Sequence, residues 1–457
     1  MQTSSSPRMQ LLLHAPIPAM LWKLAAPNLL ATLVLTSVTV ADAWYIGHLG
    51  TAALASVAVV FPFQTLMQMM AGGAIGGGVT SALARALGGN DQTHADSVGW
   101  HAIVIACVMS LVFVVALGLF CRPVFSVLGA KGEVLEGAVR YARLAFGGAT
   151  VTWLFYALAA VLRGTGDTTT PARAIIASSM AQVALSGLFT LGSGPIPALG
   201  IIGPPAAFIL CQGAAAIVMA RHFLGGRAGV HIRPQAVRWR PFGDIMRVGG
   251  IGLLNSLTIV ATVVTVTWCV GRYGTEALAG YGLGSRLELM LVPIVFGIGG
   301  ALTAAVGINY GARQYARARR IAWSGAGAAL LITGAIGLGV WLAPNVWLGR
   351  FTADPKAYAY GALYLGIAAP FYGLFGAGQT LYFASQGTGR MLLPVLVGLL
   401  RFAIVATAGA FAVSRSLDIS VVFSAVAAGL AVIGIGLGLC LLSPVWRPEP
   451  AAAKQPA

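Results

Sequence analysis

The chain has 457 residues, of which 58% are hydrophobic and only 9% are charged, and its mean hydropathy is +0.85. These values exclude a soluble globule and indicate an integral membrane protein built of helices. The formal net charge of +16 does not indicate a nucleic acid partner, because the basic residues gather in the loops expected on one side of a membrane.

Twelve apolar segments long enough to span a membrane follow one another along the chain. They lie at about 21–46, 53–78, 98–120, 137–161, 172–192, 202–224, 245–271, 277–307, 320–343, 357–384, 392–413 and 419–443. With the N-terminus inside, 19 of the 28 lysine and arginine residues fall in inner loops and tails, and eight fall outside. This bias places both termini in the cytoplasm and the chain in the plasma (inner) membrane as a multi-pass protein. We expect residues 1–20 to form a cytoplasmic segment and not a cleaved signal peptide.

The first apolar segment carries a polar stripe that includes an acid. Five polar residues share about one third of the helix surface: Asn28, Thr32, Thr36, Thr39 and Asp42. A charged side chain at membrane depth costs roughly 2.5–3.5 kcal/mol, so this stripe is expected to face protein or water. The alternative is that Asp42 lies near the outer end of its helix and touches lipid headgroups.

The sequence repeats itself at an offset of 223 or 224 residues. Residues 44–55 align with residues 268–279. Three further pairs keep the offset of 223: Tyr141 with Tyr364, Trp100 with Trp323, and Gly164-Thr165-Gly166 with Gly387-Thr388-Gly389. Each repeat holds six helices, an even number, so both halves run the same way through the membrane.

The repeat predicts an all-α fold of twelve transmembrane helices in two six-helix lobes, related by a pseudo-two-fold axis along the membrane normal, with a central cavity between them. The expected organisation is a cytoplasmic segment (1–20), an N-lobe (21–224), a linker (225–244), a C-lobe (245–443) and a cytoplasmic tail (444–457). The basic linker is expected to be a solvated inner loop attracted to anionic lipid.

The second half has a similar polar stripe without the acid. Asn255, Thr258 and Thr262 share one helix face, while the position that matches Asp42 is a valine. Tyr156 on the fourth segment and Gln379 on the tenth occupy matching positions. We count all five polar residues as candidates to line a substrate cavity.

Glu288 is the other acid well inside an apolar segment. Arg401 lies at a similar expected depth, so an ion pair between the two is one interpretation, and a substrate- or proton-binding role for Glu288 is the other. The sequence contains no phosphate-binding glycine loop, no metal-ligand spacing and no Ser–His–Asp set at one depth. We therefore expect no enzymatic activity, no metal, no cofactor and no disulfide, and any transport must draw on an ion gradient or run downhill.

Three motifs in this order resemble the multidrug and toxic compound extrusion (MATE) family. They are Pro27 through Asp42 to Gly47-His48-Leu49-Gly50, then Gly164-Thr165-Gly166-Asp167 through Pro171, then Arg286-Leu287-Glu288. The resemblance covers roughly residues 18–443, and the branch that looks most similar is that of DNA-damage-inducible protein F. It implies two lobes, a central cleft and cation-driven export of drugs or metabolites, with Asp42 as the cation-coupling residue.

Two departures from the family pattern limit what the resemblance implies. Gln182 and Ser186 stand where relatives commonly have Asn and Asp, and Phe208 stands where a Thr is often found. Mechanisms with two carboxylates in the first lobe therefore do not carry over. Gln182 and Ser186 remain candidates for the cavity, and the second-lobe acids that some sodium-coupled relatives hold on helices 7 and 10 are missing.

The expected function is a secondary active multidrug or metabolite exporter that works as a proton antiporter by alternating access, with Asp42 as the protonation site. One carboxylate suits a proton better than a sodium ion, which usually needs several oxygen ligands. The expected partners are amphipathic cationic or neutral small molecules, protons and the lipid bilayer, and the expected state is a monomer. The alternatives are a flippase for a lipid-linked sugar and a non-transporting membrane scaffold or receptor subunit.

Overall fold

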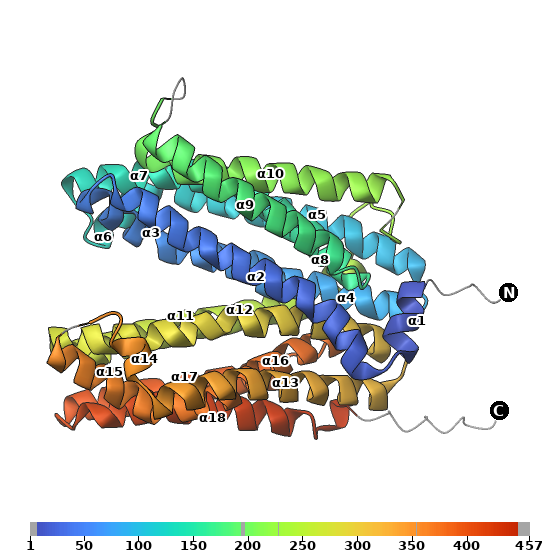
Figure 1. The fold of residues 1–457 in the computed structure, drawn as a ribbon. Helices are drawn as coiled ribbons and strands as arrows, with labels where there is room; N and C mark the ends of the chain where they lie inside the picture. The colour runs from blue at the N-terminus through green and yellow to red at the C-terminus, as the bar shows by residue number, and fades with distance from the viewer. Residues whose placement is uncertain (1–6, 193–196, 227, 353, 447–457) are drawn as a thin grey trace, which may run out of the picture. The chain divides into compact units, whose positions relative to one another are not determined.

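The computed structural model describes residues 7–192, 197–226, 228–352 and 354–446. In chain order its helices are α1 (Pro7–His14), α2 (Ile17–Gly47), α3 (Thr51–Gln68), η1 (Met69–Ile75), α4 (Gly76–Gly88), α5 (Gln92–Phe113), η2 (Val114–Leu119), α6 (Cys121–Val127), α7 (Gly132–Gly147), α8 (Ala149–Gly164), α9 (Thr169–Leu191), η3 (Gly200–Ile202), α10 (Gly203–Leu224), α11 (Trp239–Gly271), α12 (Thr275–Gly311), α13 (Tyr315–Leu342), α14 (Asn345–Leu348), α15 (Pro355–Ala368), η4 (Ala369–Phe371), α16 (Tyr372–Thr388), α17 (Leu392–Ser414), α18 (Ile419–Cys440) and η5 (Pro444–Trp446) (Figure 1).

The described helices account for twelve membrane spans. Eleven are continuous stretches of helix long and apolar enough to cross a membrane, and the twelfth is the pair α7 and α8, which bends by 44°. Gly147 and Gly148 lie at that bend, where a glycine pair permits a sharp kink. The predicted number of spans is therefore confirmed.

The second span contains a wider turn between α3 and α4. The segment η1 forms π-helix and includes Gly72, and a Cβ added to this glycine would lie 3.0 Å from the ring of Tyr156 on α8. A local π-helical turn adds a residue to the helix and redirects the side chains that follow it. Residue periodicity alone does not predict such a turn.

The chain divides into two compact units, one formed by residues 26–249 and the other by residues 1–25 together with 250–457. The main packing pairs of the first are α9 with α10, α3 with α7, and α4 and α5 with α8. In the second unit, α16 packs against α12, α13 and α18. Helix α12 also packs against α15, and α17 packs against α18. Each division point falls inside a helix, α2 or α11.

Both units pack matching helices through the same hydrogen bond. Thr80 on α4 donates to the carbonyl of Ala160 on α8 at 2.9 Å. Thr303 on α12 donates to the carbonyl of Phe383 on α16, also at 2.9 Å. Donor and acceptor are each displaced by 223 residues, so the sequence repeat is also a repeat of packing contacts.

The N-terminal residues pack against the second half of the chain. Leu12 on α1 is fully buried, and its carbonyl accepts a hydrogen bond of 3.1 Å from the Nδ2 atom of Asn309 on α12. Arg317 on α13 donates to the carbonyl of Ala15. Helix α1 and the start of α2 are thus an integral part of the second unit.

The linker is largely exposed, as expected, but part of it packs on the first unit. Helix α11 already begins at Trp239, inside the expected linker. Ala228 and Val230 are each 1% exposed, and Val230 and Ile232 pack on α5 at Gly99. Ala228 and Val230 are the apolar residues that this segment buries, while most of residues 231–240 are exposed, as a solvated loop would be.

Candidate functional site

Asp42 lies in a small polar cluster within the first unit. The Oγ atom of Ser186 donates a hydrogen bond of 2.5 Å to its Oδ1 atom, and the Nε2 atom of Gln182 lies 3.4 Å from its Oδ2 atom. Both partners are on α9, four residues apart and therefore on one helix face. Ser186 is fully buried and Gln182 is 3% exposed, whereas Asp42 is half-buried. These are the two residues that replace the amide and acid common in relatives.

Tyr141 completes the surroundings of Asp42 and was not among the predicted site residues. It is 5% exposed, interacts electrostatically with Asp42, and donates a hydrogen bond of 3.2 Å to the Oε1 atom of Gln64 on α3. The sequence held one signal for Tyr141, since it keeps the repeat offset to Tyr364. Asp42 thus has two neutral hydrogen-bonding partners, with the hydroxyl of Tyr141 in its electrostatic surroundings.

The remaining polar residues of α2 lie apart from this cluster. Thr32 donates to the carbonyl of Asn28, and Thr36 donates to the carbonyl of Thr32 at 2.9 Å, so these hydroxyls bond to their own helix. Asn28 is buried, while Thr36 and Thr39 are exposed. Fourteen residues of helix separate Asn28 from Asp42, about 21 Å. The stripe is therefore not a single site.

The polar candidates on α11 and α16 are buried or half-buried and lie among helices of their own unit. Thr258 and Thr262 donate to the carbonyls one turn earlier, at 2.8 and 2.7 Å. Asn255 is 7% exposed and packs against α17, where a Cβ added to Gly398 would lie 2.8 Å from its Oδ1 atom. Gln379 on α16 is also buried. Like Tyr156, which packs on η1 in the first unit, these residues remain candidates to line a cavity.

Glu288 and Arg401 are close together in the second unit, as one interpretation of the sequence proposed. The Nη2 atom of Arg401 lies 3.9 Å from the Oε1 atom of Glu288, and the hydroxyl of Tyr364 donates to Oε2 at 2.8 Å. A separation of 3.9 Å is too long for a hydrogen bond. Arg401 is 8% exposed, and its Nε atom has no hydrogen-bond partner among the described residues. The pair is buried and loosely joined.

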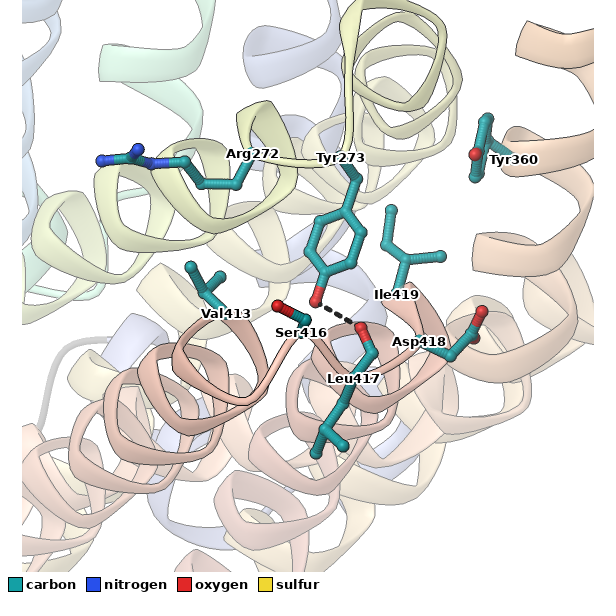
Figure 2. Close-up of a pocket in the computed structure, with 8 residues that line it drawn as sticks. All are labelled: Arg272, Tyr273, Tyr360, Val413, Ser416, Leu417, Asp418 and Ile419. Carbon is teal, nitrogen blue, oxygen red and sulfur yellow. Dashed lines mark hydrogen bonds between the residues drawn. The ribbon is translucent and has the colours of Figure 1, made fainter.

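A pocket of about 400 Å³ lies elsewhere, where the ends of α11, α17 and α18 meet in the second unit (Figure 2). Its lining consists of Arg272, Tyr273, Tyr360, Val413, Ser416, Leu417, Asp418 and Ile419. The Tyr273 hydroxyl donates to the Leu417 carbonyl at 2.9 Å, and hydrogen bonds from the Ser420 side chain and backbone lower the pKa of Asp418. These groups already bond to neighbouring loop residues or to a helix end, and none of the predicted site residues lies here.

No group of three or more His, Cys, Asp or Glu side chains is placed to hold a metal ion within the described ranges. What the geometry offers chemically is one titratable carboxylate among neutral hydrogen-bonding groups in the first unit, and one carboxylate–guanidinium pair in the second. The first arrangement can gain and lose a proton without a counter-ion.

The sequence profile of the MatE family matches residues 27–188 and 253–411, one range in each half of the repeat. The FAD transporter of Shewanella oneidensis is 29% identical over 68% of this chain and 69% of its own length. The probable multidrug resistance protein NorM of Thermotoga maritima is 24% identical over 82% of this chain and 81% of its own. A solved structure of a MOP superfamily transporter from Pyrococcus furiosus is 23% identical to this chain and superimposes with a TM-score of 0.87. The match covers 95% of this chain and 97% of the other, so the two proteins have the same fold.

Proposed function

The chain belongs to the MatE family of membrane transporters, and we propose that it exports small amphipathic compounds across the plasma membrane in exchange for protons. In this proposal Asp42 is the protonation site and both termini are cytoplasmic. The single observation that carries it is the cluster around Asp42, in which the carboxylate has the neutral side chains of Ser186 and Gln182 as its hydrogen-bonding partners.

The composition of this cluster favours a proton over a sodium ion. A sodium site needs several oxygen ligands, whereas a proton needs one acid and a partner that accepts a hydrogen bond when the acid is neutral. The Ser186 hydroxyl can donate to the Asp42 carboxylate and can accept from the protonated acid. The Gln182 amide group can only donate to this carboxyl from its Nε2 atom, so its contact weakens when Asp42 is protonated. Protonation thus changes how α2 is held against α9, which provides the conformational coupling that alternating access requires.

The relatives support two kinds of substrate. NorM of Thermotoga maritima is named a probable multidrug resistance protein, which supports export of varied amphipathic compounds. The relative with 29% identity is named an FAD transporter, and this similarity makes a flavin dinucleotide the second candidate substrate. Vesicle assays with a cationic dye and with FAD, each as sole substrate, distinguish the two.

The experiment is uptake into inverted membrane vesicles with proton and sodium gradients imposed separately. An acidic interior should drive dye uptake by the wild-type protein, and Asp42→Asn should reduce it to the background of empty vesicles while the protein remains folded. Glu136→Gln is the matched control, because Glu136 is an exposed acid 2.7 Å from Arg122, and its loss should leave uptake unchanged. Asp42-dependent uptake driven by sodium at equal pH and zero membrane potential would contradict proton coupling.

A further inference from the structure

The segment between α10 and α11 is held along one face of α5. We call residues 228–238 the strap; it lies in the same unit as α5 and the start of α11. Three side chains of α5, each four residues from the next, form hydrogen bonds with the backbone of the strap. Gln92 donates to the carbonyl of Gly229 at 3.0 Å, and Asp96 accepts from the backbone nitrogen of His231 at 2.9 Å. Trp100 donates to the carbonyl of Gln235 at 2.8 Å. This spacing places the three anchors on one face of the helix.

Apolar packing adds to these bonds. Val230 is 1% exposed, and a Cβ added to Gly99 of α5 would lie 3.4 Å from Val230 and 3.3 Å from Ile232. Glycine at this position therefore lets the strap approach the helix closely. The strap is an ordered part of the first unit.

The last anchor of the strap is a buried histidine whose charge state is fixed by its partners. His101 is fully buried, its Nδ1 atom lies 2.7 Å from the carbonyl oxygen of Ser97, and its Nε2 atom lies 2.7 Å from the backbone nitrogen of Arg238. A carbonyl only accepts, so Nδ1 carries a hydrogen; a backbone N–H only donates, so Nε2 carries none. The ring is therefore the neutral tautomer protonated on Nδ1.

Protonation of His101 would break this anchor. A hydrogen on Nε2 would point at the N–H of Arg238, so both groups would be donors and neither would have an acceptor. The imidazolium would also be a buried charge without a partner, which is costly. Both costs are relieved if the backbone N–H of Arg238 moves away from Nε2 and water enters to solvate the imidazolium.

A second histidine on α5 responds in the opposite sense. The Nε2 atom of His94 lies 2.8 Å from the Oδ2 atom of Asp244 on α11, and a protonated ring would bind this carboxylate more strongly. Acid therefore keeps the start of α11 attached to α5 while it frees the strap. The other charged groups in these surroundings engage one another: Arg85 and Arg240 interact with Asp244, Arg240 lies 3.9 Å from Asp91, and His231 lies 3.8 Å from Asp96.

We propose that the strap is a pH-dependent clamp on the first unit, closed while His101 is neutral and released around Arg238 when His101 is protonated. The opening follows from the contacts of His101 alone. Its consequence for transport rests on the proposed function: in a proton-driven exporter with this loop in the cytoplasm, the clamp opens as imported protons accumulate, and transport slows.

The test is hydrogen–deuterium exchange of the purified full-length protein in detergent at pH 7.5 and pH 5.5, the range in which a free imidazole changes charge. After correction for the intrinsic exchange rate, protection of the peptide that contains Arg238 should fall by about tenfold or more at pH 5.5. His101→Gln replaces the ring with an amide that does not titrate but can donate and accept, and it should keep the peptide equally protected at both pH values. His231→Gln, which removes an exposed imidazole from the same strap, should respond as the wild type does.

Equal protection of the wild-type strap at both pH values would overturn the clamp, and this holds even if His101→Gln fails to fold. An acid response that persists in a folded His101→Gln protein would also overturn it. Transport is measured separately: His101→Gln should keep at acidic cytoplasmic pH the rate that the wild type loses. If no proton-driven transport is seen in either protein, the proposed function fails, while the exchange data still decide whether the clamp exists.

Discussion

At the scale of single residues, the two lobes hold their intramembrane acids in different ways. Asp42 has neutral partners, whereas Glu288 has Arg401 at 3.9 Å and a hydrogen bond from Tyr364. Tyr141 and Tyr364 occupy matching positions of the repeat, and each lies beside the acid of its own unit. A common scaffold thus carries a titratable acid in one half and an ion pair in the other.

We predict that Glu288→Gln lowers stability more than it changes ion dependence. The substitution leaves the buried Arg401 guanidinium without its counter-charge, and breaking a buried pair typically costs roughly 3–5 kcal/mol. The measurement is the apparent Tm of the purified protein, with transport assayed alongside. The double variant Glu288→Gln/Arg401→Gln should recover part of the loss because it removes both charges. A Glu288→Gln protein of wild-type stability with altered ion dependence would instead assign Glu288 to coupling.

At the scale of elements, the sequence predicted the spans because each is a long apolar run bounded by loop residues. One of its two interpretations of Glu288 also placed this acid near Arg401, because the two charges had similar expected depth. It did not predict the contacts that depend on where helices bring distant side chains. Tyr141 on α7 enters the electrostatic surroundings of Asp42 only through tertiary packing, and the strap binds α5 through backbone groups that no motif marks. The polar residues of α2 stay candidates to line a cavity, and they are spread along the helix axis because periodicity predicts a shared face but not a shared depth.

The matched glycines Gly164 and Gly387 explain how two helix pairs approach closely enough for the repeated threonine hydrogen bond. A Cβ on Gly387 would lie 2.8 Å from the carbonyl oxygen of Thr303 and 2.9 Å from the backbone nitrogen of Gly307. A Cβ on Gly164 would first meet the side chain of Leu83, at 2.8 Å. The backbone atoms near Gly387 can shift less easily than the flexible side chain of Leu83 to accommodate an added Cβ atom.

We therefore predict that Gly387→Ala destabilises the protein by roughly 1–3 kcal/mol and that Gly164→Ala destabilises it less. The measurement is the apparent Tm of each purified variant. Gly327→Ala on α13 is the control, since nothing lies within 4 Å of its added Cβ and alanine favours the helix. Equal stability of Gly387→Ala and Gly327→Ala would mean that the contact between α12 and α16 is looser than the geometry indicates.

At the scale of the whole molecule, the basic residues and the twelve spans make one topology prediction. Odd and even loops must alternate between the two sides of the membrane, and the positive-inside rule places the loops richer in arginine in the cytoplasm. Four exposed positions report on these loops: Ala198 and Ser416 on the outer side, and Ala236 and Ala316 on the inner side. Ala236 lies in the strap, but its own side chain faces solvent, so a cysteine there leaves the anchors in place.

We predict that a membrane-impermeant maleimide added to intact cells labels Ala198→Cys and Ser416→Cys above the wild-type background, and that Ala236→Cys and Ala316→Cys are labelled only after the membrane is opened. The pair Ala198 and Ala236 is the sharpest comparison, because a single membrane span, formed by η3 and α10, runs between them. If both positions react from the same side, α10 does not cross the membrane and the count of twelve spans is wrong. If all four positions are labelled from the side opposite to the predicted one, the count of twelve spans is kept, but the positive-inside rule has failed for this chain. The strap with His101 would then face outward and would sense the external pH.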